Sequence, residues 1–440
     1  MEVTTEVLKG PPVEETSSSG RGLAWSILLT LVTLNVFNYA DRSILSIAIE
    51  AIKIDLGFSD TQMGALQTVL YIGVGLITLP AGVLVDRWSR KKALALMGFL
   101  WSLATVGTAS VHSFVVMMMM RFGCGAGESS FHPGGAAWLS AIFSKETRAR
   151  VISLMHVGAF IGSIFGVVLG GYLIASTGNW RVPFYVFGAP GFVLAMILVF
   201  IRDPAPVVDK VAKGQSLFSE FKEMVKVRSF LFTIFGAGFV NVLFITMMSW
   251  LPALIMRSYG INEARLGAVM GIAFVPGAVA PLIAGFLADK FQARRADGRP
   301  LLASIIVAFV AVGAVLQFWF VGQVSLTVFT IMLAIFTFVT NMTIVFFQVI
   351  TMDVMPLRNR GKAASLCVLV MFLGFSWWGS LLVGMVSDMY GGGCDGLRIG
   401  MLALCPFPFM GSVFYYIASR FYPADSAAAD EMDLHELATH

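Results

Sequence analysis

Four charged side chains stand in long apolar stretches of the sequence, where charge is rare. Asp41 and Arg42 are neighbours in the first of these stretches, and Arg121 and Glu128 lie seven residues apart in the fourth. A spacing of seven puts two side chains on one face of an α-helix, about 10 Å apart along its axis. A charge at the centre of a bilayer costs about 2.5–3.5 kcal/mol. Charged residues in a helix that crosses a membrane are therefore candidates for a functional or structural role.

Two acids and two arginines allow two interpretations. In the first, Asp41 or Glu128 takes up a proton and frees its arginine, which then binds an anionic group of a substrate. In the second, the four residues form a static network of buried ion pairs that fixes the packing of the helices. We favour the first, with Asp41 and Glu128 coupling to protons and Arg42 and Arg121 binding the substrate.

The second half of the chain offers neutral groups instead, since its acids fall near the ends of its apolar stretches. We expect Asn241, Gln348 and Trp377 to contribute to substrate binding, among many phenylalanines and methionines. An apolar wall with a few hydrogen-bonding groups, opposite two arginines, suits an amphipathic anion. Lipid contact or core packing remains the alternative for each single aromatic residue.

The composition places these stretches in a membrane. Of the 440 residues, 57% are hydrophobic and only 13% are charged, whereas a soluble domain has about 25% charged residues. The mean hydropathy is +0.82. A formal net charge of +4 over 440 residues provides no basic patch for a nucleic acid. These values exclude a soluble enzyme, a disordered chain and a nucleic-acid partner, and they predict an integral membrane protein.

No metal or cofactor is expected. The four cysteines have no paired spacing, the five histidines are scattered without an H-E-x-x-H pattern, and no Walker A sequence occurs. ATP is therefore not the predicted energy source.

Twelve apolar stretches long enough for a membrane-spanning helix follow one another along the chain. Backbone amides in lipid must be satisfied internally, so these stretches are predicted helices of an all-α membrane protein, in two pseudo-symmetric six-helix bundles. The stretches are 23–52, 61–85, 93–112, 114–141, 151–176, 180–201, 229–257, 262–288, 301–322, 325–353, 363–388 and 396–421.

Lysine and arginine predict the orientation. With both termini in the cytoplasm, cytoplasmic segments hold 23 of these residues and outside loops hold 5, as the positive-inside rule requires. We expect a multi-pass protein, in the plasma (inner) membrane if the source is bacterial. The predicted parts are a cytoplasmic tail 1–22, a bundle 23–201, a cytoplasmic loop 202–228 with a surface helix or a simple linker, a bundle 229–421 and a cytoplasmic tail 422–440.

A short motif occurs twice, once in each half. The pattern G-x-L-x-D-[RK] with trailing basic residues ends the second stretch and, about 200 residues later, the eighth. Glycine permits close helix packing, and an aspartate at a helix end can pair with basic groups. We expect a conformational latch here, with anchoring of the loop by its charges as the alternative. The latch residues are Gly82, Asp86, Arg87, Arg90 and Asp289.

Over roughly residues 23–421, the sequence resembles the major facilitator superfamily, by its twelve stretches, the repeated motif and R-x-x-x-G-x-G at 121–127. Four segments are similar to Spinster-like members of that superfamily. Organic-anion/proton symporters share N-Y-x-D-R at 38–42 and the spacing from Arg121 to Glu128. The Spinster-like segments are 38–42, 127–131, 250–254 and 382–388.

The resemblance and the buried charges together predict a secondary active transporter that works by alternating access. We expect it to be a monomer that moves an organic, anionic or amphipathic solute, small or lipid-like, coupled to protons. Alternatives are a proton symporter of small organic acids, such as sugar acids or aromatic carboxylates, and a drug/proton exporter. An enzyme is not expected, because each buried acid is matched by an arginine.

Overall fold

Helices make up all regular structure in the part of the chain that the computed structural model describes, residues 18–129, 131–202 and 217–439. The first half contains α1 (Ser18–Leu56), α2 (Asp60–Arg87), α3 (Arg90–Ser110), α4 (Phe114–Glu128), α5 (Phe131–Ile142), α6 (Lys145–Thr177) and α7 (Arg181–Phe200). The second half contains α8 (Leu217–Met224), α9 (Arg228–Tyr259), α10 (Glu263–Gln292), α11 (Gly298–Phe320), α12 (Leu326–Asp353), α13 (Arg360–Val370), α14 (Trp377–Met389), α15 (Gly393–Leu402) and α16 (Pro406–Thr439).

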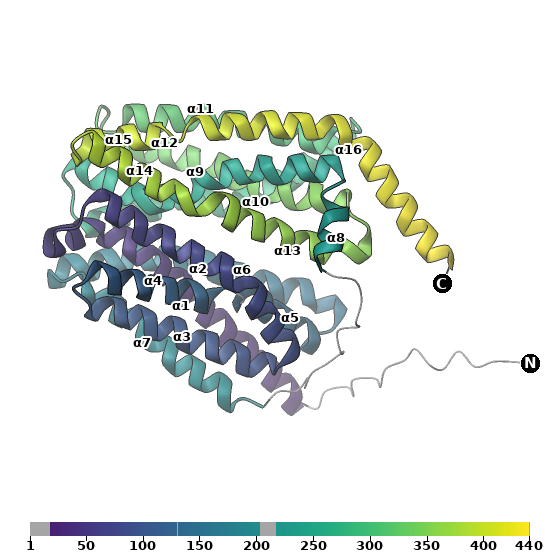
Figure 1. Ribbon diagram of the computed structural model, residues 1–440, viewed down its shortest axis with the longest axis horizontal. Helices are drawn as coiled ribbons and strands as arrows, with labels where there is room; N and C mark the ends of the chain where they lie inside the picture. The colour runs from purple at the N-terminus through teal and green to yellow at the C-terminus, as the bar shows by residue number, and fades with distance from the viewer. Residues whose placement is uncertain (1–17, 130, 203–216, 440) are drawn as a thin grey trace, which may run out of the picture.

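The long helices run side by side in two layers (Figure 1). Helices α1 to α7 form one layer, and α9 to α16 form the other, with the start of α1 and the end of α16 at the same end of the molecule. Within the described residues, nine helices are long and apolar enough to cross a membrane by length and composition. Their surfaces expose many large apolar side chains, as lipid contact requires. The expected all-α membrane architecture is thus confirmed.

Three predicted stretches are interrupted where the sequence suggested one continuous helix. The stretch 114–141 is split into α4 and α5, and Pro133 falls in the first turn of α5, where its missing amide is tolerated. The stretch 363–388 is α13 and α14, joined by a π-helical turn over Met371–Ser376. In the stretch 396–421, α15 is short, and α16 begins at Pro406 and continues through the predicted tail. Apolar composition alone does not reveal such breaks.

A glycine stripe on α6 brings this helix against α1. A Cβ at Gly162 would lie 2.3 Å from the carbonyl oxygen of Val36, and one at Gly166 would lie 2.5 Å from that of Ala40. Only glycine permits this approach. Because Ala40 directly precedes Asp41, the stripe sets the depth and position of the charged pair on α1.

Candidate functional site

Arg42 and Glu128 form an ion pair between α1 and α4. The Nε atom of Arg42 lies 2.6 Å from Oε2 of Glu128, and the side chain of Glu128 is wholly buried while that of Arg42 is 21% exposed. The guanidinium carbon of Arg42 also lies 4.9 Å from the centre of the Tyr39 ring. The arginine therefore joins a buried acid to an accessible surface.

Arg121 and Asp41 pair behind it, with looser geometry. The closest approach, from NH1 of Arg121 to Oδ1 of Asp41, is 3.9 Å, and both side chains are fully buried. Thr105 of α3 donates a hydrogen bond of 2.8 Å to the other carboxylate oxygen of Asp41. Among the described residues, no hydrogen-bond partner is found for the three side-chain nitrogens of Arg121 or for Oδ1 of Asp41. This part of the site has unused hydrogen-bonding capacity.

Two glycines hold α4 where these pairs can form. A Cβ at Gly125 would lie 2.0 Å from the carbonyl oxygen of Leu70 on α2, and one at Gly127 would lie 2.6 Å from the amide nitrogen of Trp101 on α3. The glycines of R-x-x-x-G-x-G thus let α4 lie directly against α2 and α3. Arg121 and Glu128, at the two ends of the motif, are placed by this packing.

Arg42 lines a hollow between the two layers, which we call the central hollow. Tyr39, Gln67 and Tyr71 share its wall with Phe244 and Met248 from the second half, around about 770 Å³ of space that is partly open. A positive charge with hydroxyl and amide groups on one side, and apolar groups on the other, is suited to an amphipathic anion. Arg121 and Asp41 do not line this hollow.

The predicted residues of the second half are dispersed. Asn241 lines a separate hollow and donates a hydrogen bond of 2.7 Å to the hydroxyl of Ser376. Gln348 is exposed on α12 and lines neither hollow. Trp377 packs against a buried cluster that includes Leu70 and Tyr71, and its carbonyl accepts a hydrogen bond from Thr68. These three residues do not share the cavity that the sequence suggested.

The structure describes the predicted latch residues only in part. No described atom lies within 4 Å of a Cβ placed at Gly82, so the close packing expected there is not seen in this structure. Arg90 begins α3, and the side chains of Asp86 and Arg87 lie outside the described residues. Asp289 pairs with Arg299 at 2.8 Å, and Arg299 also pairs with Asp353 at 2.7 Å.

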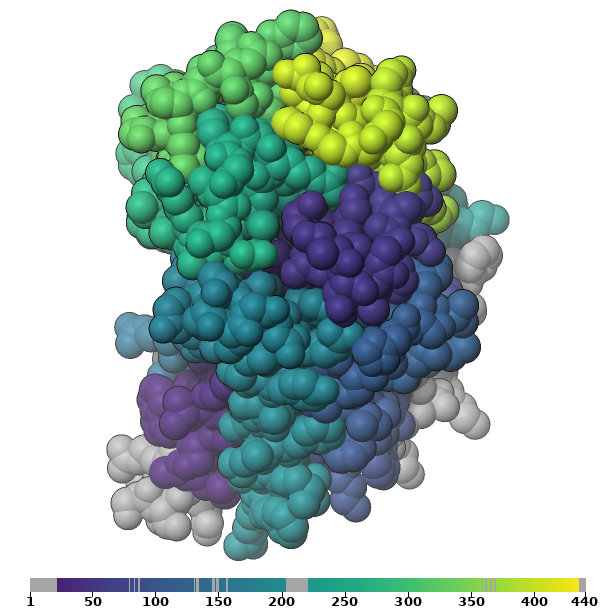
Figure 2. Space-filling view, turned by 90° about the vertical axis from the view of Figure 1, so that its left-hand side faces the viewer, coloured from purple at the N-terminus to yellow at the C-terminus, as the bar shows by residue number. Residues whose placement is uncertain are grey.

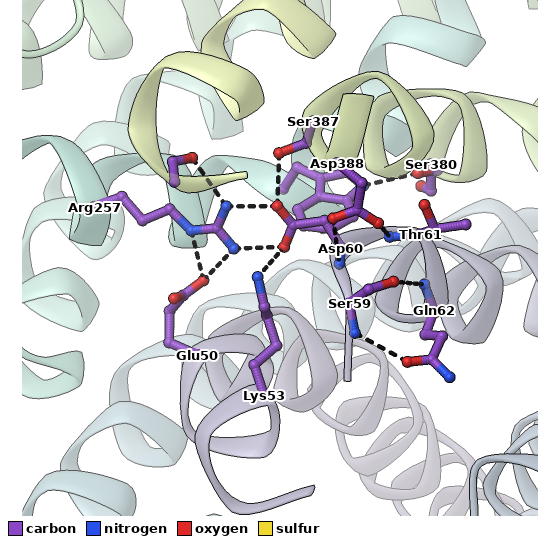
Figure 3. Close-up of polar contacts among 12 residues, drawn as sticks. Glu50, Lys53, Ser59, Asp60, Thr61, Gln62, Arg257, Ser380, Ser387 and Asp388 are labelled. Carbon is purple, nitrogen blue, oxygen red and sulfur yellow. Dashed lines mark hydrogen bonds and ion pairs between the residues drawn. The ribbon is translucent and has the colours of Figure 1, made fainter. Parts of the chain in front are cut away.

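A second charged cluster lies at the end of the molecule opposite the start of α1 and the end of α16, and the sequence did not suggest it. We call it the Asp60 cluster (Figure 3). Arg257 of α9 donates hydrogen bonds of 2.8 and 2.7 Å to the two carboxylate oxygens of Asp60, the first residue of α2. Its Nε donates to Glu50 at 2.9 Å. The members of the cluster are Glu50, Lys53, Asp60, Arg257, Ser387 and Asp388.

The Asp60 cluster ties the two layers together. Ser387 donates a hydrogen bond of 2.6 Å to Asp60. Asp388 accepts the backbone amide of Thr61 at 2.7 Å and so caps the start of α2. A Cβ at Gly384 would lie 2.3 Å from the carbonyl oxygen of Asp60. In Figure 2, the indigo segment that joins α1 and α2 lies against green and yellow segments of the second half. This end of the molecule is closed between the two layers.

Sequence reasoning missed this cluster because its members looked like ordinary residues at span ends. Lys53 directly follows the predicted stretch 23–52, and Arg257 and Asp388 are the last residues of the stretches 229–257 and 363–388. The available signal was the capping box formed by Ser59 and Gln62, which marks the start of α2 and puts Asp60 in its first turn. It does not indicate which residues of the other half contact Asp60.

Comparison with known proteins agrees with this architecture. The family model of the Major Facilitator Superfamily matches residues 31–379. The chain is 27% identical over 277 residues to the probable L-galactonate transporter of Escherichia coli strain K12, with 60% of this chain and 61% of that transporter covered. It is 25% identical to an MFS-type efflux pump of Mycolicibacterium smegmatis, covering 91% of this chain and 94% of the pump.

Spinster proteins are also similar to it. Protein spinster homolog 1 of Xenopus tropicalis is 24% identical, covering 82% of this chain and 73% of that protein. The crystal structure of a bacterial homolog to the human lysosomal transporter Spinster, in an inward-facing and unoccupied conformation, superposes with a TM-score of 0.80 at 21% identity, over 93% of this chain and 99% of that chain. The family model spans most of the chain, and the fold is that of transporters and not of enzymes. The protein therefore belongs to the Major Facilitator Superfamily and is a multi-pass membrane transporter, with Spinster proteins among the relatives to which it is similar.

Proposed function

We propose that this protein is a secondary active transporter that binds an organic anion at Arg42 and couples its movement to protons through Glu128 and Asp41. The observation that carries the proposal is the pair between a wholly buried acid and an arginine that reaches the central hollow. When Glu128 is ionised, Arg42 is held by it. When Glu128 is protonated, the guanidinium is free for an anionic group in the hollow. Protons and substrate are then linked through one side chain.

Asp41 and Arg121 supply a second proton site behind the first. Their separation of 3.9 Å leaves hydrogen-bonding capacity that is costly to bury unused. Protonation of Asp41 would free Arg121 to turn toward Glu128, which shares the same face of α4. A change in the protonation of Asp41 would thereby affect the pair of Arg42 and Glu128, and no further ionisable group would be needed.

The Asp60 cluster supports alternating access. It closes one end of the molecule, and we expect the central hollow to be reached from the opposite end, where α1 begins and α16 ends. With the orientation expected from lysine and arginine, the closed end faces outside and the structure represents an inward-open state. The open surroundings of Gly82 agree with this interpretation, since a latch at the cytoplasmic end would engage only in the opposite state.

The substrate class is proposed from the wall of the central hollow. One side carries Arg42 with tyrosine and glutamine, and the other carries Phe244, Met248 and Met270. Such a surface fits an anion with an apolar body. Small organic acids are the second candidate, because relatives of this chain include the probable L-galactonate transporter and a hexuronate transporter of Bacillus subtilis. A drug/proton exporter is the third, on the similarity to the efflux pump.

Counterflow in proteoliposomes tests the proposal. Vesicles loaded with an unlabelled hexuronate, or with decanoate, would be diluted into the labelled compound with and without an inward proton gradient. We expect uptake of the labelled anion that the gradient enhances and that Arg42→Ala removes. The proposal would be contradicted if the rate of uptake were the same with and without the gradient and the same in Arg42→Ala as in the native protein. A preference for one of the two compounds would choose between the substrate classes.

A further inference from the structure

A second hollow lies beside the central one, and we call it the side hollow. It surrounds about 640 Å³ of partly open space between α9, α12, the π-helical turn and α16. Every residue that lines it belongs to the second half of the chain, whereas the central hollow is lined from both halves. A path for cargo would run between the halves. The side hollow is instead a chamber within one of them.

The wall of the side hollow is apolar in effect. Asn241 uses its Nδ2 for a hydrogen bond to Ser376, and Thr343 uses its hydroxyl for the carbonyl of Thr340. Alanine, valine, isoleucine, phenylalanine and methionine supply most of the remaining surface. The lining is mostly apolar, which suits an alkyl chain better than a charged head group.

Among the residues that the structure describes, Phe244 alone lines both hollows. It also lines a third, smaller one, between α6, α9, α10 and α12. On α9, Asn241 lies three residues before it and Met248 four residues after it, so all three share one helix face. That face passes from the side hollow at Asn241 to the central hollow at Met248. Phe244 stands at the boundary.

The Phe244 ring is free to serve as a boundary. Phe239 of the same helix is packed at 5.1 Å against Phe375 and at 5.5 Å against Phe414. Within the described ranges of the chain, no comparable ring pair holds Phe244, and its side chain is partly exposed. A large ring between two spaces limits what can extend from one to the other.

We propose that Phe244 is a specificity-determining residue that limits the length of the apolar body of the transported anion. The inference rests on the proposed anion site at Arg42. The head group binds Arg42, the apolar body runs along α9, and its end meets the Phe244 ring. The side hollow stays outside the binding site while the phenylalanine is present.

Binding of a series of straight-chain carboxylates tests this inference. Affinity for acetate, butanoate, hexanoate, octanoate and decanoate would be measured on the full-length protein in nanodiscs, with empty nanodiscs subtracted. Each methylene that becomes buried raises affinity roughly fourfold. For the native protein we expect affinity to stop rising at the chain length whose last carbon reaches Phe244. For Phe244→Ala we expect it to continue for at least two further methylenes, about 15-fold in total.

Matched variants make the result specific. Phe274 lines the central and the smaller hollow but not the side hollow, so Phe274→Ala should leave the length limit in place. Phe244→Trp fills the boundary more fully and should stop the gain at the same length or a shorter one. Thermal unfolding shows whether each variant is folded, and Phe244→Leu replaces Phe244→Ala if the latter is not.

Two outcomes would overturn the inference: an unchanged length limit in the folded small variant at position 244, or a shift of the limit in Phe274→Ala equal to the shift in that variant. Failure of the proposed anion site would give a different result from failure of this inference. If the anion site is at Arg42, Arg42→Ala should weaken binding of every chain length by the same factor. If it does not, the anion site is wrong, whereas the comparison between positions 244 and 274 can still be read.

Discussion

The guanidinium of Arg121 lies 3.9 Å from the carboxylate of Asp41, beyond hydrogen-bonding distance, although both side chains are fully buried. The neighbouring pair, Arg42 with Glu128, is at 2.6 Å. Two pairs of the same chemistry are thus held at different separations within one site. If the four residues only fixed the packing of the helices, the folded state would be more stable with both pairs at hydrogen-bonding distance. The difference favours a site in which partners exchange as protons and substrate bind.

Replacing Glu128 by glutamine should uncouple transport from protons. The amide resembles the protonated acid, so Arg42 stays available and the site can still bind and exchange its anion. We expect accumulation driven by a proton gradient to fall to background, with counterflow retained, in proteoliposomes. Glu223→Gln, at an exposed position on α8, is the control and should accumulate normally. Undiminished accumulation in Glu128→Gln would exclude the coupling role.

Replacing Arg42 by alanine should weaken binding of the anion. A hydrogen bond to a charged group contributes about 1.5–3 kcal/mol, so affinity should fall roughly tenfold to a hundredfold. Isothermal titration in detergent or nanodiscs measures this change. Because Glu128 would lose its partner, the double variant Arg42→Ala/Glu128→Gln is needed, and it should bind as weakly as the single one. Arg265→Ala, an exposed position on α10, should bind normally. Native affinity in Arg42→Ala would remove this residue from the site.

Replacing Asp60 by asparagine should open the closed end. Arg257 and Lys53 would lose their buried carboxylate, and breaking such a pair costs about 3–5 kcal/mol. Spin labels at Ile54 and Tyr390, both exposed and one in each half, would report the distance by double electron–electron resonance, with the four native cysteines replaced. We expect a longer component to appear.

Asp395→Asn is the matched control for this experiment. Asp395 lies near the same end, and its side chain is 81% exposed, so its removal should leave the distances unchanged. A native distance distribution in Asp60→Asn would show that the cluster does not hold this end closed.

Replacing Gly166 by alanine should disturb the charged site from a distance. The new Cβ would lie 2.5 Å from the carbonyl oxygen of Ala40, and overpacking of this kind typically costs 1–3 kcal/mol. We expect a lower melting temperature and weaker counterflow. Gly170→Ala is on the same helix, and no described atom lies within 4 Å of its Cβ position. It should be as stable as the native protein. Equal behaviour of the two variants would contradict the proposed packing role.

Much of this architecture could be predicted from the sequence. The length of an apolar stretch predicts α10 over 262–288, and the helix is observed over Glu263–Gln292. The agreement follows because the thickness of the bilayer sets the length of every helix that crosses it. The pairing of Glu128 and Asp41 with arginines was expected on energetic grounds, since hydrocarbon does not tolerate lone charges. Which arginine pairs with which acid depends on side-chain packing and had to come from the structure.

Other features were beyond sequence reasoning. The contact of Asp60 with Arg257 joins residues almost 200 positions apart and depends on which end of the molecule is closed. Gln348 and Trp377 are polar or aromatic residues in predicted apolar stretches, and composition does not indicate which face of a helix lines a cavity. Gly82 shows a related limit, because the motif pattern does not indicate which contacts its glycine makes in this structure.

The π-helical turn at Met371–Ser376 changes the direction in which the side chains of α14 point relative to those of α13. A π turn holds one residue more than an α turn, and one residue corresponds to about 100° of rotation in an α-helix. Side chains after the turn therefore point in directions that an unbroken helix would have given to their neighbours. Ser376, at the end of the turn, is the residue that receives the hydrogen bond from Asn241. Deleting a single residue from this turn would rotate one half of the helix against the other while leaving its hydrophobicity almost unchanged.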